Sequence, residues 1–239
     1  MDVKFTVNKP YLWLENLAKN LNVEVHDNTV YLPQDIGEGF IKQFHFQEEF
    51  TLNYLRFHLT KPFSFIRKAG DERGVSPIFF YINNSNYEQH IEENTVNVGL
   101  KAANGTFWPS NQIETRWTFP LNEWVSNITI AINHKWLIDC LDNEREGYIN
   151  QLINQTQPYY IFEEITAEML PVLKAIESAV QNKSGKGISN LYLKSKTIEL
   201  LTLFFEKLIE HPISKNLKEI HPSDIEKIFT IKNKLFENF

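Results

Sequence analysis

Short segments with a two-residue period fill the chain from Val23 to about Ile132, and they limit the possible folds more than any other feature. Alternating apolar and polar residues are typical of half-buried strands, and the Gly, Pro, Asn and Asp residues between the segments favour turns. Many short strands in succession predict an antiparallel sandwich or barrel. We expect strands at Val23–Val25, Asn28–Leu32, Gly39–Phe46, Phe50–Leu59, Phe63–Lys68, Ser76–Asn83, Thr95–Leu100, Asn111–Phe119 and Trp124–Ile132.

Helical spacing of apolar residues occurs on both sides of this region, which makes the predicted fold class α+β. Pro10 suits the start of a short helix over Tyr11–Leu21, and a second short helix is expected at His134–Leu141. Thr166 is a cap for a helix that runs to about Asn182. The capping box that begins at Ser223 opens a further helix. That helix reaches Phe239 without a stop signal, which indicates a cut rather than a natural end.

The longest predicted helix covers Asn190–Leu208 and follows a short Gly-containing loop, so it forms a hairpin with the helix before it. Its apolar residues recur at seven-residue steps along two adjacent rows. We expect this stripe to pack partly on the preceding helix and partly on a second subunit. The dimerisation candidates are Leu191, Ile198, Leu201, Phe205 and Leu208.

Composition narrows the function classes. The net charge of −6 argues against a broad phosphate-binding surface, because such surfaces are made by clustered Lys and Arg. A single cysteine, Cys140, cannot form an intramolecular disulfide, and we expect it to be a buried, inert thiol in a reducing compartment. Charged residues interrupt the first twenty positions, so no signal peptide or membrane span is expected. These features predict a cytoplasmic protein.

Aromatic residues and arginines in the strand region are the candidates for ligand binding. A cavity lined by rings with a few convergent donors suits a small organic ligand, and Arg suits a carboxylate or phosphate. The alternative, that most of these rings are core and the arginines lie at a rim, stays open. So does the question of which face of Phe50–Leu59 points inward. The candidates are Tyr54, Arg56, His58, Phe79, Tyr81, Trp108, Arg116 and Trp117.

Motifs for catalysis are weak in this sequence. No phosphate-binding loop, serine elbow or HExxH motif is present. His45 and His58 are the closest useful histidine pair, but a metal site needs more converging ligands than their spacing guarantees. We therefore expect no catalytic residues, no metal and no cofactor. The alternative is a metalloenzyme that acts on a small organic substrate with His45 and His58 in its metal site.

Residues Gln157–Leu208 resemble the linker region of AraC-type transcriptional regulators, most closely the branch that includes siderophore-responsive regulators. The resemblance is carried by the aromatic connector, by the helix start at Thr166–Met169 and by the long run from Leu191 to Leu201. The preceding segment, with Arg116–Phe119 and Ile128–Leu141, resembles the cupin-like effector domain of the same branch. The HxH-and-Glu pattern of metal-binding cupin enzymes is missing, which weakens an enzymatic interpretation.

The resemblance implies three regions and a sensing function. They are a cupin-like effector-binding domain at 1–150, a helical linker and dimerisation region at 151–212, and the start of a truncated helix-turn-helix domain at 213–239. The resemblance further implies a homodimer that binds a small-molecule effector. It would contact DNA through a C-terminal domain that is not in this chain, and it would not contact a membrane.

Overall fold

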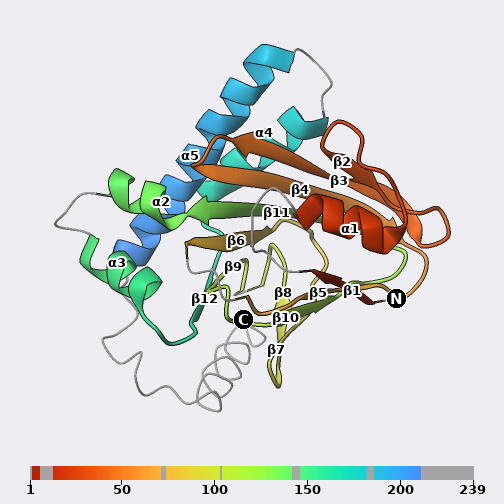
Figure 1. Ribbon diagram of the computed structural model, residues 1–239, viewed down its shortest axis with the longest axis horizontal. Coiled ribbons are helices and arrows are strands. Elements are labelled where there is room, and N and C mark those ends of the chain that lie inside the picture. Colours follow the sequence, from red (N-terminus) through yellow and green to blue (C-terminus); the bar gives the residue numbers. More distant parts are fainter. Residues whose placement is uncertain are drawn as a thin grey trace.

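The computed structural model describes residues 2–5, 13–70, 74–102, 104–141, 146–181 and 186–210. Two β-sheets pack face to face, and a pair of long helices covers the outer face of the larger sheet (Figure 1). The predicted α+β class, with an antiparallel sandwich followed by a helical hairpin, is confirmed. The predicted helix at Asp224–Phe239 and the region 213–239 lie outside the described residues.

The larger sheet has seven strands in the order β12-β9-β6-β11-β4-β3-β2, and all of its neighbouring pairs are antiparallel. Its longest strands pair residue by residue, which fixes the face on which each side chain lies. The bounds are β2 (Thr29–Tyr31), β3 (Gly37–Phe46), β4 (Phe50–Leu59), β6 (Val75–Tyr81), β9 (Thr106–Pro109), β11 (Trp124–Asn133) and β12 (Tyr160–Glu163).

The smaller sheet has five strands in the order β1-β5-β10-β7-β8. Its β1–β5 pair is parallel and its other pairs are antiparallel. Alternate residues of β10 are buried and exposed, as expected for a sheet with one wet face. The bounds are β1 (Asp2–Phe5), β5 (Ser64–Arg67), β7 (Tyr87–Ile91), β8 (Asn94–Val98) and β10 (Thr115–Thr118).

Five helices complete the described fold: α1 (Trp13–Leu21), α2 (His134–Cys140), α3 (Glu146–Asn154), α4 (Met169–Gln181) and α5 (Lys186–Glu210). The backbone N–H groups of Lys135 and Trp136 donate to the side-chain oxygen of Asn133, which caps α2. Among the described helices, none is long and apolar enough to cross a membrane.

Two apolar cores lie on opposite faces of the seven-stranded sheet. The inner core fills the space between the sheets and includes the buried face of α1. The outer core lies between the same sheet and helices α2 to α5. Strand β4 contributes to both, because Leu55 and Phe57 belong to the inner core whereas Leu52 and Tyr54 belong to the outer core.

The structure agrees with most of the predicted elements, and β4 has the predicted bounds. Strands β1, β7, β9 and β12 and helix α3 were not predicted. Val23–Val25 is not a strand; a single bridge joins His26 to Thr29 instead. Position 150 falls inside α3, and β12, which lies in the expected helical linker, pairs with β9 as part of the larger sheet.

The prediction of a buried Cys140 is wrong, because this side chain is exposed at the end of α2. Leu137 is the buried residue of that helix. Partial desolvation, together with the carboxylates of Glu49 and Asp139, raises the pKa of the Cys140 thiol, which keeps it protonated near neutral pH.

Candidate functional site

A small cavity lies between the two sheets, with a volume of about 60 Å³. The larger sheet supplies one wall, the smaller sheet supplies the other, and Trp13 reaches it from the first turn of α1. Among the described residues that line it, none carries a formal charge. They are Phe5, Trp13, Asn53, Leu55, Phe65, Pro77, Phe79, Trp117, Phe119, Asn127, Thr129 and Ala131.

Two asparagine amides are the main polar groups of the cavity wall. Asn53 is fully engaged, since its Oδ1 accepts hydrogen bonds from Gln43 Nε2 at 2.8 Å and from Trp13 Nε1 at 3.2 Å. Asn127 differs, because its buried Oδ1 has no hydrogen-bond partner within the described part of the chain. The Asn127 amide also interacts with the buried hydroxyl of Tyr87. A buried acceptor without a donor is costly, so a ligand or water that donates to the Asn127 oxygen would be favoured beside this tyrosine.

A hydrogen-bonded network lies directly behind Trp117. Its indole Nε1 donates to the hydroxyl of Tyr81 at 3.1 Å, and that hydroxyl donates to Gln89 Oε1 at 2.5 Å. Burial raises the pKa of Tyr81 well above its usual value, so the phenol stays neutral. The network holds the Trp117 ring in a fixed orientation against the cavity.

Arg67 is a buried cation that interacts electrostatically with Tyr81. Its guanidinium donates to the turn before β10, and Arg67 is not among the described residues that line the cavity. It donates to the carbonyl oxygen of Ile113 at 2.8 Å and makes longer contacts to Ser110 O, Asn111 and Thr115 at 3.4 to 3.5 Å. Burial lowers the pKa of Arg67 to about 10. The contacts give it a structural role at that turn.

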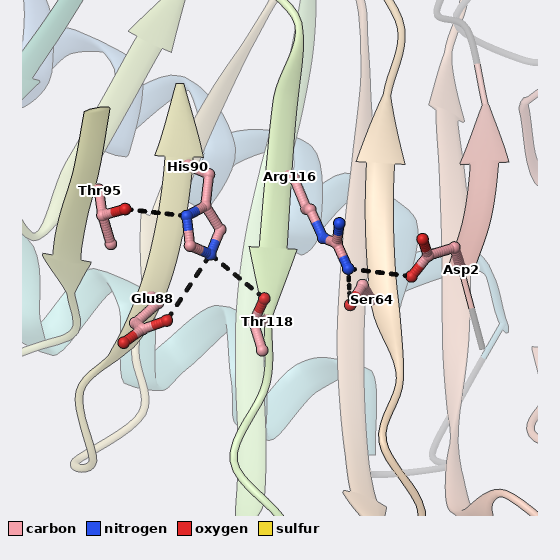
Figure 2. Close-up of polar contacts among 7 residues, drawn as sticks. All are labelled: Asp2, Ser64, Glu88, His90, Thr95, Arg116 and Thr118. Carbon is pink, nitrogen blue, oxygen red and sulfur yellow. Dashed lines mark hydrogen bonds and ion pairs between the residues drawn. The ribbon is translucent and has the colours of Figure 1, made fainter. Parts of the chain in front are cut away.

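Polar residues on the outer face of the smaller sheet form a separate surface (Figure 2). Arg116 donates to Asp2 at 3.2 Å, while His90 contacts Thr95 at 2.9 Å and Thr118 at 3.4 Å. His90, Arg116 and Thr118 border an open depression that also includes Glu92 and Glu114. Because the Arg116–Asp2 pair is exposed to solvent, it adds about 0–1 kcal/mol to stability at most.

The structure brings only part of the predicted ligand-binding set together. Phe79 and Trp117 line the cavity, and Tyr81 supports it from behind. Their ring centroids confirm the grouping, since Phe79 and Trp117 lie 4.9 Å apart.

The other five candidates lie elsewhere, because adjacent residues of a strand point to opposite faces. Tyr54 and Trp108 are buried in the outer core, against α4 and α5. Arg56 and His58 lie beside the exposed ring of Trp124, at 4.8 Å and 5.6 Å from its centroid. Arg116 lies on the outer face of the smaller sheet. The arginines of the predicted set therefore do not reach the cavity.

Sequence reasoning missed the two asparagines and Trp13. Asn53 and Asn127 sit at inward positions of β4 and β11, between residues of the outer core. Asn53 lies on the same face of β4 as Leu55, and Asn127 lies on the same face of β11 as Val125. A polar residue at such a position indicates a pocket only when that face is known to point inward.

The alternative metal site at His45 and His58 is excluded by the strand register. In the β3–β4 hairpin, His45 pairs with Thr51 near the turn, whereas His58 pairs with Glu38 at the far end. Seven residues along an extended strand separate the two positions by roughly 23 Å. Among the described residues, no group of three metal-ligating side chains comes together.

The dimerisation candidates divide into two groups. Leu201, Phe205 and Leu208 are buried in the chain's own outer core, so these three do not offer a surface to a second subunit. Leu191 and Ile198 are exposed, at 71% and 38%. The buried face of α5 is instead made by Leu193, Thr197, Leu200, Leu201, Phe204, Phe205 and Leu208.

Comparisons with known proteins give structural neighbours only. No protein-family model matches the sequence, and no curated protein matches it either. A cupin 2 conserved barrel domain protein from Salinispora arenicola is 5% identical, with a TM-score of 0.32 over 48% of this chain and 83% of its own. The cupin_2 domain of an XRE family transcriptional regulator from Enterobacter cloacae is 10% identical, with a TM-score of 0.31 over 44% of this chain and 96% of its own.

A third neighbour, KdgF from Halomonas sp., is 8% identical, with a TM-score of 0.34 over 45% of this chain and 87% of its own. The first two of these neighbours are described as cupin domains. At these identities and TM-scores, the likeness carries no argument about what this chain binds or does.

Proposed function

We propose that this chain is the effector-sensing and dimerisation region of an AraC-like transcriptional regulator, and that its effector binds in the cavity between the sheets. The proposal rests on the observation that the two faces of the seven-stranded sheet contact different parts of the molecule. One face lines the cavity, and the opposite face packs on the α4–α5 hairpin. A change on one side therefore reaches the other through a single layer of backbone.

Adjacent residues on the same strands make this link specific. On β6, Phe79 lines the cavity, and its neighbour Phe80 packs edge-on against Phe204 of α5 at 5.9 Å. On β4, Asn53 lines the cavity, and its neighbour Tyr54 is bonded to α4.

The contact between β4 and α4 is polar and directional. The Tyr54 hydroxyl donates to Glu177 Oε1 at 2.8 Å and accepts from Gln181 Nε2 at 2.8 Å. A ligand changes an output only through different affinities for two arrangements of the molecule. We propose that the two arrangements differ in how α4 and α5 sit on the sheet.

Hydrogen exchange tests the proposal. Small neutral compounds are first screened by thermal shift, and exchange of α4 and α5 is then measured with and without a stabilising compound. We expect altered protection in Met169–Gln181 and Lys186–Glu210 as well as in the cavity strands. A compound that protects the cavity strands and leaves the hairpin unchanged contradicts the sensing role.

Dimerisation is proposed through the exposed face of α5, where Leu191, Tyr192 and Ile198 are solvent-accessible in the single chain. The double variant Leu191→Asp/Ile198→Asp is expected to keep its fold and to sediment as a monomer in analytical ultracentrifugation. Leu121→Asp is the matched control, since Leu121 is 41% exposed and lies outside α5. A wild-type monomer, or a double variant that remains dimeric, contradicts this interface.

The proposal assigns binding rather than turnover to the chain, and a cytoplasmic location where its DNA target is accessible. DNA contact is assigned to a C-terminal domain outside this chain. An activity assay for substrate turnover is therefore expected to be negative with compounds that bind in the cavity.

A further inference from the structure

Trp13 holds an unusual position among the residues that line the cavity, which is partly open to solvent. It is the first residue of α1, it remains partly exposed, and its ring packs 5.7 Å from Phe5. Its Nε1 donates to Asn53 Oδ1 on β4, so it occupies an acceptor that a ligand with a donor group could otherwise use. The walls formed by the sheets are held by strand ladders, whereas Trp13 is held at the end of a helix.

The space that remains beside Trp13 is too small for an aromatic effector. The cavity measures about 60 Å³. An engineered protein cavity of about 150 Å³ is known to bind benzene, so this one holds water or a single small group at most. A ligand of ring size needs the volume that the Trp13 indole occupies.

We infer that Trp13 fills part of the effector site in the ligand-free protein, and that the effector replaces its indole. This inference rests on the proposed function, because it takes the cavity to be the effector site. It defines the ligand class as a planar, neutral aromatic compound with an N–H or O–H donor. That donor takes over the hydrogen bond to Asn53 Oδ1.

The remaining wall supports a neutral donor rather than an anion. The described lining residues carry no formal charge, and transfer of an unpaired carboxylate into such a site is strongly unfavourable. Asn127 supplies a second buried acceptor without a partner among the described residues. An acceptor of this kind repels a carboxylate oxygen and favours a second donor.

Binding of indole to Trp13→Ala tests the inference by isothermal titration calorimetry. We expect indole to bind this variant at least about tenfold more tightly than the wild type, because the ring no longer competes. Benzofuran, which has an oxygen in place of the N–H, is expected to bind the variant about tenfold more weakly than indole, since it cannot donate to Asn53 Oδ1 and leaves that oxygen with the Gln43 hydrogen bond alone. Trp124→Ala is the matched control, because Trp124 is an exposed tryptophan outside the cavity.

Trp13→Leu makes the same comparison if the alanine variant does not fold, and the NMR signal of the Trp13 indole N–H is followed in the wild type. Saturating indole is expected to shift that signal as the bond to Asn53 is lost. The inference is overturned if indole binds Trp13→Ala no better than Trp124→Ala, or if benzofuran and indole bind it equally.

These outcomes separate the inference from the proposed function. If another compound binds the wild type and alters hairpin exchange while the Trp13 variants show no gain, the inference fails and the sensing role stands. If indole displaces Trp13 in the wild type, as its indole N–H signal reports, without any change in the exchange of α4 or α5, the sensing role fails and the displacement of Trp13 stands.

Discussion

At the scale of single residues, two apolar side chains of α5 have opposite environments. Phe205 is 5% exposed and packs edge-on against Trp108 at 5.4 Å, whereas Ile198 is 38% exposed. Phe205→Ala is therefore expected to lower the free energy of unfolding by about 3–5 kcal/mol through a core cavity. Ile198→Ala is expected to change it by less than about 1 kcal/mol. Urea denaturation measures both, and equal effects contradict the assigned burial.

Phe205 and Ile198 also explain why the predicted apolar stripe of α5 is only partly buried. Leu191, Ile198 and Phe205 are seven residues apart, and such a row drifts by about 20° per step around an α-helix. The row therefore begins on the exposed side at Leu191 and reaches the core only at Phe205. The sequence predicts a helix with an apolar row, but the position of the sheet decides which part of the row is covered.

At the scale of elements, β4 and α4 are linked by the hydroxyl of Tyr54. Tyr54→Phe removes its bonds to Glu177 and Gln181 and keeps the buried ring, so we expect the sandwich to remain folded. Losing hydrogen bonds that involve a carboxylate costs about 1.5–3 kcal/mol. Hydrogen exchange in α4 is expected to be faster in Tyr54→Phe than in the wild type, with a smaller change in β11. Phe80→Leu serves as the control, since it alters the contact to α5 and leaves the Tyr54 bonds in place.

Helices and strands were predicted correctly where the residues of the segment itself favour that structure. Strand β4 combines a clear two-residue period with turns at both ends, and its bounds were predicted correctly. Strand β12 has four residues, and it is a strand because it pairs with β9, about fifty residues earlier in the chain. Pairing of this kind is a tertiary contact, and a short aromatic segment does not reveal it.

At the scale of the whole molecule, buried tyrosines predict loss of stability in alkali. Burial raises the pKa of Tyr81, Tyr87 and Tyr159 in the folded state above the value of about 10 for an exposed tyrosine. Their contribution to stability is complete below pH 10 and is lost as the pH rises further, because only the unfolded chain releases these protons. Arg67 acts in the opposite direction, since its pKa is lowered to about 10, but it is a single group.

We therefore expect cooperative unfolding above about pH 10. Tyrosinate absorbance and far-ultraviolet circular dichroism, recorded together against pH, measure it. The buried tyrosines are expected to ionise only as the secondary structure is lost. Ionisation of all tyrosines near pH 10 in a protein that stays folded contradicts this prediction. Tyr31→Phe, which removes an exposed tyrosine, is expected to leave the midpoint unchanged.

The sequence by itself determined the local features of this protein: a region of short strands, a helical hairpin after it, and the apolar residues that each must bury. These features follow from hydrophobic periodicity and turn residues, which depend only on residues close together in the sequence. Only the tertiary structure decided that Phe79 and Trp117 share a cavity with Asn53, and that Tyr54 lies on the far side of the same strand. The choice of face depends on strand register and on which helices cover the sheet, and both are set by contacts between distant parts of the chain.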